Sequence, residues 1–297
     1  MKVGEPSLDQ LRIFVEIVDQ GSFGAAARSL GRTVSAMSYG IAQMEAQLGV
    51  SLFEREGSRR PVLTRDGEGL LAEARAVVDR SDALLAKAQS LHAGLESRIA
   101  LVLDVMMPAE VTAAVLREFR RMFPTVALEL NIEGLGAVAQ LLLYGSAGLG
   151  IGGPVIGEHH ALERQTIGEI DLIPVAAFGH PLTQPAIAPG ESRQHLQLVL
   201  ADRSKFTEGR EFSVLSPHTW RLGDLGAKHT LLKAGLGWGN MPRAMIEGDL
   251  ASGALVALDL PERPGDHYAL SALWRRHTRL GPAASWLIDA FRERLSA

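Results

Sequence analysis

The stretch RTVSAMSYGIAQM, residues 32–44, has the pattern of a helix with two unlike sides. Its apolar residues recur at intervals of three and four, which lines one side of a helix: Val34, Met37, Ile41, Met44 and then Leu48. The other side carries small or hydrogen-bonding residues: Ser35, Ala36, Tyr39 and Gln43. Such a face suits the major groove of DNA. The alternative is a solvent-exposed helix of weak propensity, since Gly40 and two serines lower its stability.

The residues around this stretch predict a helix-turn-helix. Residues 8–18 repeat apolar side chains at helical spacing, and Ser22 is suited to cap a second helix. Thr33 can cap the third helix, and Gly49 can end it. Two helices joined by a turn of about four residues, the second with a small polar face, are typical of DNA-binding proteins.

Residues 51–64 suit a two-stranded wing, with its turn at Gly57-Ser58. Four arginines lie in or beside this wing: Arg55, Arg59, Arg60 and Arg65. Arginines there would neutralise phosphates and fix the register without reading the base sequence. The whole chain of 297 residues has a formal net charge of −4, so DNA binding depends on this local cluster rather than on overall charge.

One long helix is predicted over residues 64–91, roughly 40 Å long at about 1.5 Å per residue. A seam of mostly apolar side chains runs along it in alternating steps of four and three: Leu70, Ala74, Val77, Ser81, Leu84, Ala88 and Leu91. This seam predicts contact with the same helix of a second copy. The alternative is a core stripe within one chain.

From about residue 97 strands alternate with helices, which predicts an α/β domain with a parallel sheet. The expected strands are 98–104, 126–133, 171–179, 196–202, 211–215 and 267–274. Ligands of such sheets bind beyond the carboxyl ends of strands. That rule selects residues after three of the strands: Asp104, Met106, Met107, Leu135, Asp202, Arg203, Ser204 and Phe206.

Several other chemistries find no support in the sequence. Cysteine is absent, which excludes disulfides and thiolate chemistry and is consistent with a cytoplasmic location. There is no apolar run of about 20 residues to cross a membrane, no secretory signal, no metal-ligand spacing and no nucleophile elbow. Residues 148–153 match G-x-G-x-x-G, but a helical pattern precedes them and Pro154 follows, so the context of a dinucleotide site fails. We therefore expect no cofactor and no enzyme activity.

Three segments together closely resemble the N-terminal domain of LysR-type transcriptional regulators: SFGAAA (22–27), LGVSLFER (48–55) and LTRDG (63–67). The resemblance covers nearly the whole chain and implies a winged helix-turn-helix over residues 5–65 and a dimerising linker helix over 66–93. Over 97–297 it implies an effector-binding α/β domain that is similar to periplasmic binding proteins. Two subdomains are implied there, about 97–165 with 266–297, and about 166–265.

The resemblance also implies double-stranded DNA, a small organic effector between the subdomains, and a homodimer or homotetramer. By position it implies DNA contacts at the start of the third helix, along it and around the wing: Arg32, Thr33, Ser35, Ala36, Ser38, Tyr39, Gln43, Arg55, Arg59, Arg60 and Arg65. Val34 stands where many members have glutamine, so no base code is carried over. Asp224 and Trp238 are added to the effector residues.

An ionised Asp104 would repel an anion unless Arg203 lay beside it. We therefore expect a partly aromatic or apolar effector with hydrogen-bond donors, contacted by Met106, Met107 and Trp238. Alternatively these are ordinary core residues, with Asp104 capping the next helix. The function predicted for the chain is a ligand-responsive, DNA-binding transcriptional regulator; the alternative is a two-domain enzyme or binding protein with a dimerising helical N-terminus.

Overall fold

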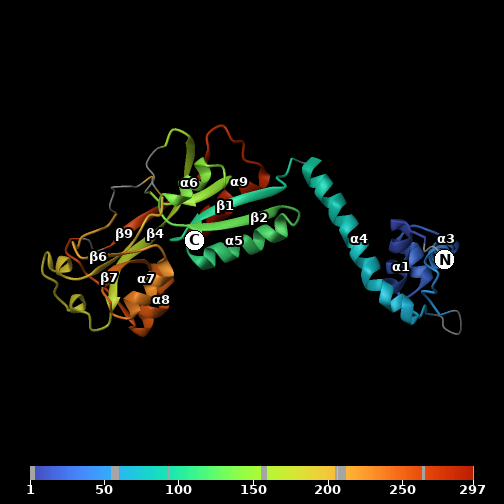
Figure 1. Cartoon of the computed structure of the whole chain (residues 1–297), viewed down its shortest axis with the longest axis horizontal. Helices are drawn as coiled ribbons and strands as arrows, with labels where there is room; N and C mark the ends of the chain where they lie inside the picture. Colours follow the sequence, from blue (N-terminus) through green and yellow to red (C-terminus); the bar gives the residue numbers. More distant parts are fainter. Residues whose placement is uncertain are drawn as a thin grey trace. The chain divides into compact units, whose positions relative to one another are not determined.

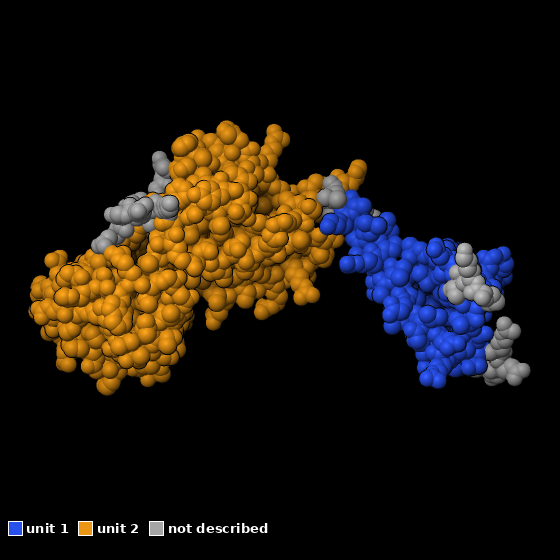
Figure 2. Space-filling model, viewed as in Figure 1, with its two compact units in different colours: residues 1–89 blue, residues 90–297 orange. Residues whose placement is uncertain are grey.

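The computed structural model describes most of the chain in two compact units, residues 1–89 and 90–297 (Figure 2). The described residues are 4–54, 60–92, 94–154, 159–204, 206, 212–262 and 265–296, with only the backbone for 89–91. Within these ranges, no helix combines the length and apolar character needed to cross a membrane.

The first unit is helical (Figure 1). It contains α1 (Leu8–Gln20), α2 (Phe23–Ser29), α3 (Val34–Leu48) and most of α4 (Arg65–His92). Both predicted caps are confirmed: the hydroxyls of Ser22 and Thr33 each accept a hydrogen bond from the backbone amide three residues on. Gly49 ends α3 in the left-handed conformation, with φ of 75°.

The apolar sides of these helices meet in one core. It includes Ile13, Phe14, Ile17, Met37, Ile41, Met44 and Phe53. Most of the predicted stripe on α3 is therefore buried, but the prediction is wrong for Val34, which is 49% exposed. Val34 is the first residue of α3 and lies a turn before the part of the helix that packs against α1.

The predicted wing is narrow. Phe53 and Leu63 form a single antiparallel bridge, flanked by a backbone hydrogen bond from Glu54 N to Val62 O at 2.9 Å. The predicted turn at Gly57-Ser58 lies outside the described residues.

The second unit contains a nine-stranded sheet in its described residues. The strands are β1 (Arg98–Asp104), β2 (Ala127–Glu133), β3 (Leu149–Gly152), β4 (Leu162–Ala177), β5 (Gln197–Leu200), β6 (Thr219–Leu222), β7 (Trp238–Pro242), β8 (Leu255–Ala257) and β9 (Asp266–Arg275). Their order is β2-β1-β3-β9-β4-β7-β5-β6, with β8 paired to β4. The helices are α5 (Ala109–Met122), α6 (Ala137–Leu143), α7 (Leu225–Lys233), α8 (Arg243–Ser252) and α9 (Pro282–Leu295), with short 3-10 turns at Pro181–Thr183 and Glu191–Gln194.

The sheet is mixed, so the prediction of a parallel sheet is wrong for its middle. One half is parallel through β2, β1 and β3, and the other half is parallel through β7, β5 and β6. The long strands β4 and β9 pair antiparallel with each other and join the two halves. Their register shifts between Thr166 and Gly168. The strand pair therefore connects two α/β halves, which correspond to the two subdomains that the family resemblance implies.

Residues 211–215 do not form the predicted strand where they are described. Ser213 has a positive φ of 56°, and its carbonyl accepts a hydrogen bond from Gln197 Nε2 at 2.7 Å. The other end of the Gln197 amide accepts from the backbone N–H of Leu215 and Ser216. A side chain therefore satisfies these backbone groups in place of a neighbouring strand. The sequence analysis also missed β6, β7 and β8.

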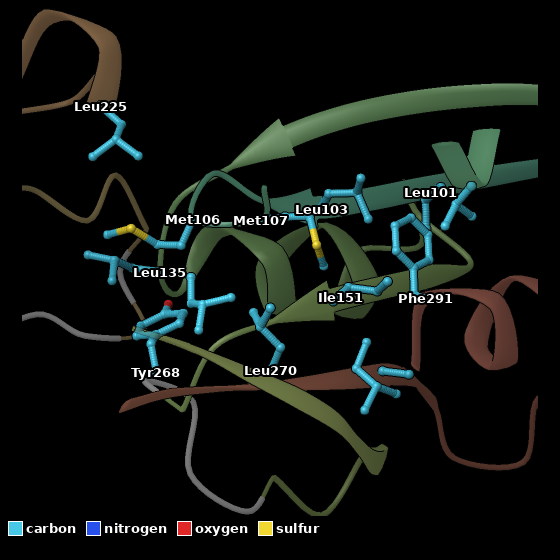
Figure 3. Packing of buried hydrophobic residues seen from close by; sticks show 14 of the residues in the cluster. Leu101, Leu103, Met106, Met107, Leu135, Ile151, Leu225, Tyr268, Leu270 and Phe291 are labelled. Atoms are coloured by element: carbon cyan, nitrogen blue, oxygen red, sulfur yellow. The ribbon is translucent and has the colours of Figure 1, made fainter. Parts of the chain in front are cut away.

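The larger core runs along the first half of the sheet toward the second (Figure 3). Its members include Leu101, Leu103, Ile151, Leu270, Phe291, Met106, Leu135, Tyr268 and Leu225. The last four of these lie where the loops after β1 and β2 approach β9 and α7.

Candidate DNA-binding face and effector cavity

The outward face of α3 consists of small and uncharged polar side chains. Each predicted contact on the helix or at its start is exposed: Arg32, Thr33, Ser35, Ala36, Ser38, Tyr39 and Gln43. Tyr39 is 65% exposed, and its hydroxyl accepts a hydrogen bond from Gln43 Nε2 at 2.7 Å. We call these exposed side chains of α3 the α3 face.

Contacts within the first unit orient the start of α3. Thr33 Oγ1 accepts a hydrogen bond from Ala36 N at 3.2 Å and lies 3.0 Å from Ser35 Oγ. The Arg32 guanidinium forms two hydrogen bonds with the Asp9 carboxylate, at 2.6 and 2.8 Å, which raise the pKa of Arg32. Arg32 is thus held by α1, with its charge already paired.

The base of the wing is attached to α3 by Glu45, a residue that the sequence analysis missed. Glu45 Oε1 accepts hydrogen bonds from the backbone N–H of Leu52 at 2.6 Å and of Phe53 at 3.3 Å. Two of the predicted phosphate contacts are described and exposed: Arg60 and Arg65. The other two, Arg55 and Arg59, lie outside the described residues.

The first part of the predicted α4 seam is buried within its own chain. Leu70 and Ala74 pack against the core of the first unit, and Ala74 is only 4% exposed. Ion pairs between Arg12 and Asp82 and between Arg75 and Asp19 also join α1 to α4. For Leu70 and Ala74 the alternative of an intramolecular stripe is therefore correct.

The rest of the seam is open. Val77 is 50% exposed and Leu84 is 68% exposed, while Ser81 is half-buried and Ala88 exposed. The side chain of Leu91 lies outside the described parts. Exposed large apolar side chains on one side of a helix remain available to a second helix.

A cavity of about 400 Å³ lies where the two subdomains meet, and we call it the cleft cavity. Its lining includes Met106, Leu135, Gln197, Leu198, Leu200, Phe212, Lys228, Asn240, Asp266 and Tyr268. Two predicted effector residues, Met106 and Leu135, are brought together here, near the ring of Tyr268 (Figure 3).

Lys228 is the functional candidate that the sequence analysis missed in this cavity. It is 4% exposed, and its Nζ donates a hydrogen bond to the carbonyl oxygen of Asn240 at 2.7 Å. Burial lowers the pKa of Lys228 from 10.5 to about 8. Among the described residues, no carboxylate pairs with it. Helical spacing in the sequence indicates that Lys228 is buried. It lies three residues after Leu225 and four before Leu232, which are both buried positions of α7.

The glycine-rich segment before α8 makes room for this lysine. A Cβ at Gly239 would lie 2.5 Å from the carbonyl oxygen of Leu198 and 3.1 Å from Lys228 Cε. Strand β7 can therefore approach both β5 and the lysine stem only with glycine at this position.

Asp104 holds three segments of the first subdomain together. It is 1% exposed; Oδ1 accepts from Met106 N at 2.9 Å, and Oδ2 accepts from Gly153 N at 3.1 Å and from the Tyr268 hydroxyl at 2.7 Å. Burial raises the pKa of Asp104 to about 6, against the opposing effect of these hydrogen bonds. Asp104 does not cap the following helix, because the N-cap residue of α5 is Pro108 and no side chain caps that helix.

The predicted residues after β5 bridge the subdomains rather than line the cleft cavity. Asp202 Oδ2 accepts from Gly136 N at 3.1 Å and from Ser204 Oγ at 2.8 Å. Arg203 pairs with Glu133 at 2.7 Å, not with Asp104. The ring of Phe206 meets the ring of His159 edge-on, with centroids 6.2 Å apart.

Two further predicted effector residues do not line the cleft cavity. Trp238 is fully buried in a separate cluster, where its Nε1 donates to the carbonyl oxygen of Ser192 at 3.1 Å. Asp224 caps α7 by accepting from Ala227 N at 2.6 Å. Both residues therefore have structural roles, and neither lines the cleft cavity.

A second cavity, of about 500 Å³, lies between the loop after β1 and the helices α7 and α8. Met107 and Asp104 line it, together with Pro108, Leu225 and Met245. The predicted residues after β1 are thus divided between two cavities, with Met106 lining both.

The G-x-G-x-x-G match at residues 148–153 serves packing. Its middle part is the buried strand β3, and a Cβ at Gly150 would lie 2.9 Å from Leu142 Cδ1 of α6. A Cβ at Gly153 would overlap the Tyr268 hydroxyl at 1.9 Å. The glycines allow a helix and a neighbouring side chain to approach β3 closely.

A winged helix-turn-helix joined to an α/β unit with a ligand-sized cavity between subdomains defines a class: DNA-binding proteins that respond to a small molecule. Comparison with known families agrees. The family "Bacterial regulatory helix-turn-helix protein, lysR family" matches residues 8–68, and "LysR substrate binding domain" matches residues 92–296. The chain therefore belongs to the LysR family of transcriptional regulators, a family of regulators and not of enzymes.

Named relatives support this assignment. The HTH-type transcriptional regulator AceR of Acinetobacter baumannii is 31% identical over 301 residues, which covers 96% of each chain. PunR of Escherichia coli, also an HTH-type transcriptional regulator, is 30% identical over 93% of this chain and 90% of its own.

Two solved structures share the fold. CrgA from Neisseria meningitidis has a TM-score of 0.53 at 19% identity, over 97% of this chain and 99% of its own. An OxyR mutant from Corynebacterium glutamicum has a TM-score of 0.53 at 21% identity, over 100% and 96%.

Proposed function

We propose that this regulator binds double-stranded DNA by placing the α3 face in the major groove, with Arg60, Arg65 and the other wing arginines on flanking phosphates. The observation that carries the proposal is the exposure of every predicted contact on α3 while the opposite side of the helix is buried. Serine, threonine and glutamine can bond base edges or phosphates, and the small Ala36 lets the backbone approach. The N-terminus of α3 also favours a phosphate near Thr33.

The sharpest test is Ala36→Glu in the full chain. Thr33 already caps the amide of residue 36, so a glutamate there completes a capping box and does not weaken the helix. The same carboxylate would meet phosphates, so affinity for DNA from upstream of its own gene should fall at least about 100-fold. The measurement is a gel shift at several salt concentrations, with thermal unfolding beside it.

The matched control is Ala72→Glu, which adds the same charge at an exposed position of α4, away from the seam. We expect it to retain nearly all of the DNA affinity. Equal binding by Ala36→Glu and the unchanged protein would remove α3 from the interface.

We further propose that the cleft cavity receives the effector. Its size lies within the roughly 300–1,000 Å³ typical of small-molecule sites. The bonds of Asp202 to Gly136 and of Arg203 to Glu133 cross between the subdomains and would report any change in their spacing. An effector can change that spacing only by binding one arrangement more tightly than another.

The oligomer is proposed to form through the open part of the α4 seam, as a homodimer that can pair into a homotetramer, in the cytoplasm. Val77 and Leu84 support this proposal by their exposure. Leu84→Lys should shift sedimentation toward the monomer and weaken binding to a two-half-site operator. We propose that the winged helix-turn-helix covers residues 5–65, the linker helix 66–93 and the effector-binding domain 97–297.

A further inference from the structure

We propose that the cleft cavity binds a small organic monocarboxylate with an apolar body, whose carboxylate is held by Lys228. This inference rests on the cleft cavity being the effector site and adds the chemical class of the effector.

The first argument is the unbalanced charge. Lys228 has three ammonium protons to donate, and one is used on the Asn240 carbonyl. Within the described residues it has no carboxylate partner, and a cation buried this deeply without one is costly. An anion in the cavity would supply the missing charge and accept the remaining hydrogen bonds.

The polar groups near Lys228 indicate which chemical group of a ligand would bind there. Both ends of the Gln197 side-chain amide already form hydrogen bonds with the loop at residues 213–216. Asn240 lines the cavity, and its backbone carbonyl oxygen accepts the one hydrogen bond that Lys228 donates. An ammonium group with protons left to donate suits one carboxylate better than a metal cation, which it would repel, or a neutral sugar.

The net charge of the cavity argues against a dianion. Asp266 is the one carboxylate among the described lining residues, at the exposed start of β9. Asp104 lies behind the Tyr268 hydroxyl. A phosphate monoester would bring a second negative charge with no second buried cation among the described residues to receive it.

The walls of the cavity suit the apolar body of the proposed ligand. Met106, Leu135, Leu198, Leu200, Phe212 and the ring of Tyr268 form mostly apolar surface. Methionine and aromatic side chains conform to flat or chain-like apolar bodies. This revises the expectation that an ionised Asp104 would exclude an anion, because Asp104 already accepts three hydrogen bonds from the protein.

Tryptophan fluorescence during thermal unfolding of the full chain tests the proposal. The four tryptophans report on the second unit alone: Trp220, Trp238, Trp274 and Trp286. The probes are benzoate and hexanoate at about 10 mM and matched ionic strength, their neutral amides, and inorganic phosphate. A fragment that binds in the millimolar range should raise the midpoint by about 3 °C.

The decisive variant is Lys228→Met, and the matched control is Lys233→Met. Lys233 is on the same helix but is half exposed and paired with Asp249, outside the cavity. We expect the two acids to raise the midpoint of the unchanged protein and of Lys233→Met, with no effect on Lys228→Met. The amides and phosphate should have little effect on any of them.

Three results would overturn the inference: no response to either acid, an equal response to acid and amide, or a response that survives Lys228→Met. Equal response to amides would still leave the cavity as an effector site, and DNA binding by the α3 face is measured separately. Without any probe, Lys228→Met should unfold a few degrees higher than the unchanged protein. A lower midpoint would make Lys228 a structural residue.

Discussion

The α3 face and the cleft cavity present polar groups under opposite conditions. On α3 the polar side chains are in water, and those that form internal hydrogen bonds, such as Thr33 and Gln43, do so without being buried. In the cavity a lysine is removed from water with a single hydrogen bond and, among the described residues, without a carboxylate partner. The exposed polar side chains of α3 reduce the stability of the fold little, whereas burial of the Lys228 charge is energetically unfavourable.

This difference suits the two partners. DNA is a large polyanion that supplies many phosphate contacts, so its binding face needs exposure and shape more than stored energy. A small effector makes few contacts, and a buried unpaired cation gives one of them a large share of the binding energy.

The largest effect is expected where α4 meets the wing. A Cβ at Gly67 would lie 2.2 Å from the carbonyl oxygen of Leu52, which is backbone and cannot rotate away. Gly67→Ala should therefore lower the free energy of unfolding of the first unit by roughly 4 kcal/mol. Hydrogen exchange of α1–α3 amides measures it, with the second unit unchanged in tryptophan fluorescence.

Gly69→Ala is the control for that prediction. Nothing lies within 4 Å of a Cβ at Gly69, so the substitution should stabilise α4 by about 1 kcal/mol through helix propensity. If both glycine variants behaved alike, close approach at Gly67 would not be the reason for its glycine.

The stored charge of Lys228 should appear as a pH dependence. Its folded-state pKa of about 8 lies below the ordinary value of 10.5, so between these values the unfolded chain holds a proton that the folded chain has lost. The free energy of unfolding of the second unit should rise by about 3 kcal/mol from pH 8 to 10.5. Lys228→Met should remove this rise, and a slope that persists in the variant would assign it to other groups.

Asp104 should give the opposite slope in acid. Its folded-state pKa of about 6 lies above the ordinary 3.8, so the folded chain holds a proton that the unfolded chain has lost. Its contribution to the free energy of unfolding should fall by about 3 kcal/mol as pH rises from 3.8 to 6. Urea unfolding of Asp104→Asn beside the unchanged protein isolates this contribution; matching slopes in the two would contradict it.

The smallest effect is expected at the cap of α3. Thr33→Ala removes the hydroxyl that accepts from Ala36 N and should cost about 1 kcal/mol in the first unit. Thr33→Ser should retain the stability. DNA affinity that recovers with stability in Thr33→Ser would separate capping from direct contact with DNA.

Local rules predicted the first unit well because its signals are local. Caps, a left-handed glycine and three-four spacing depend on neighbours a few residues apart, and they located α1, α2 and α3 and the exposed side of α3. The seam was only partly predictable. Ala74 and Leu84 share the same helical spacing, but Ala74 is buried in its own unit and Leu84 is exposed.

The cavity was harder because its residues are joined by tertiary structure. Met106 and Leu135 follow strands and were found, but Lys228 lies inside a helix and Asn240 inside a strand that was missed. Trp238 was predicted to contact the effector from the family resemblance and is instead enclosed by its own cluster. Which of several apolar or charged positions face one another depends on the mixed strand order, which periodicity does not encode.

The most direct test of the account uses the absence of cysteine. Ser38→Cys places a unique thiol on the α3 face, and Ala72→Cys places one on α4 as a control. Both should react with a maleimide at similar rates in the free protein. When operator DNA is bound, reaction of Ser38→Cys should slow by at least about tenfold while that of Ala72→Cys stays unchanged. An equal rate for Ser38→Cys with and without bound DNA would contradict the placement of α3 in the groove.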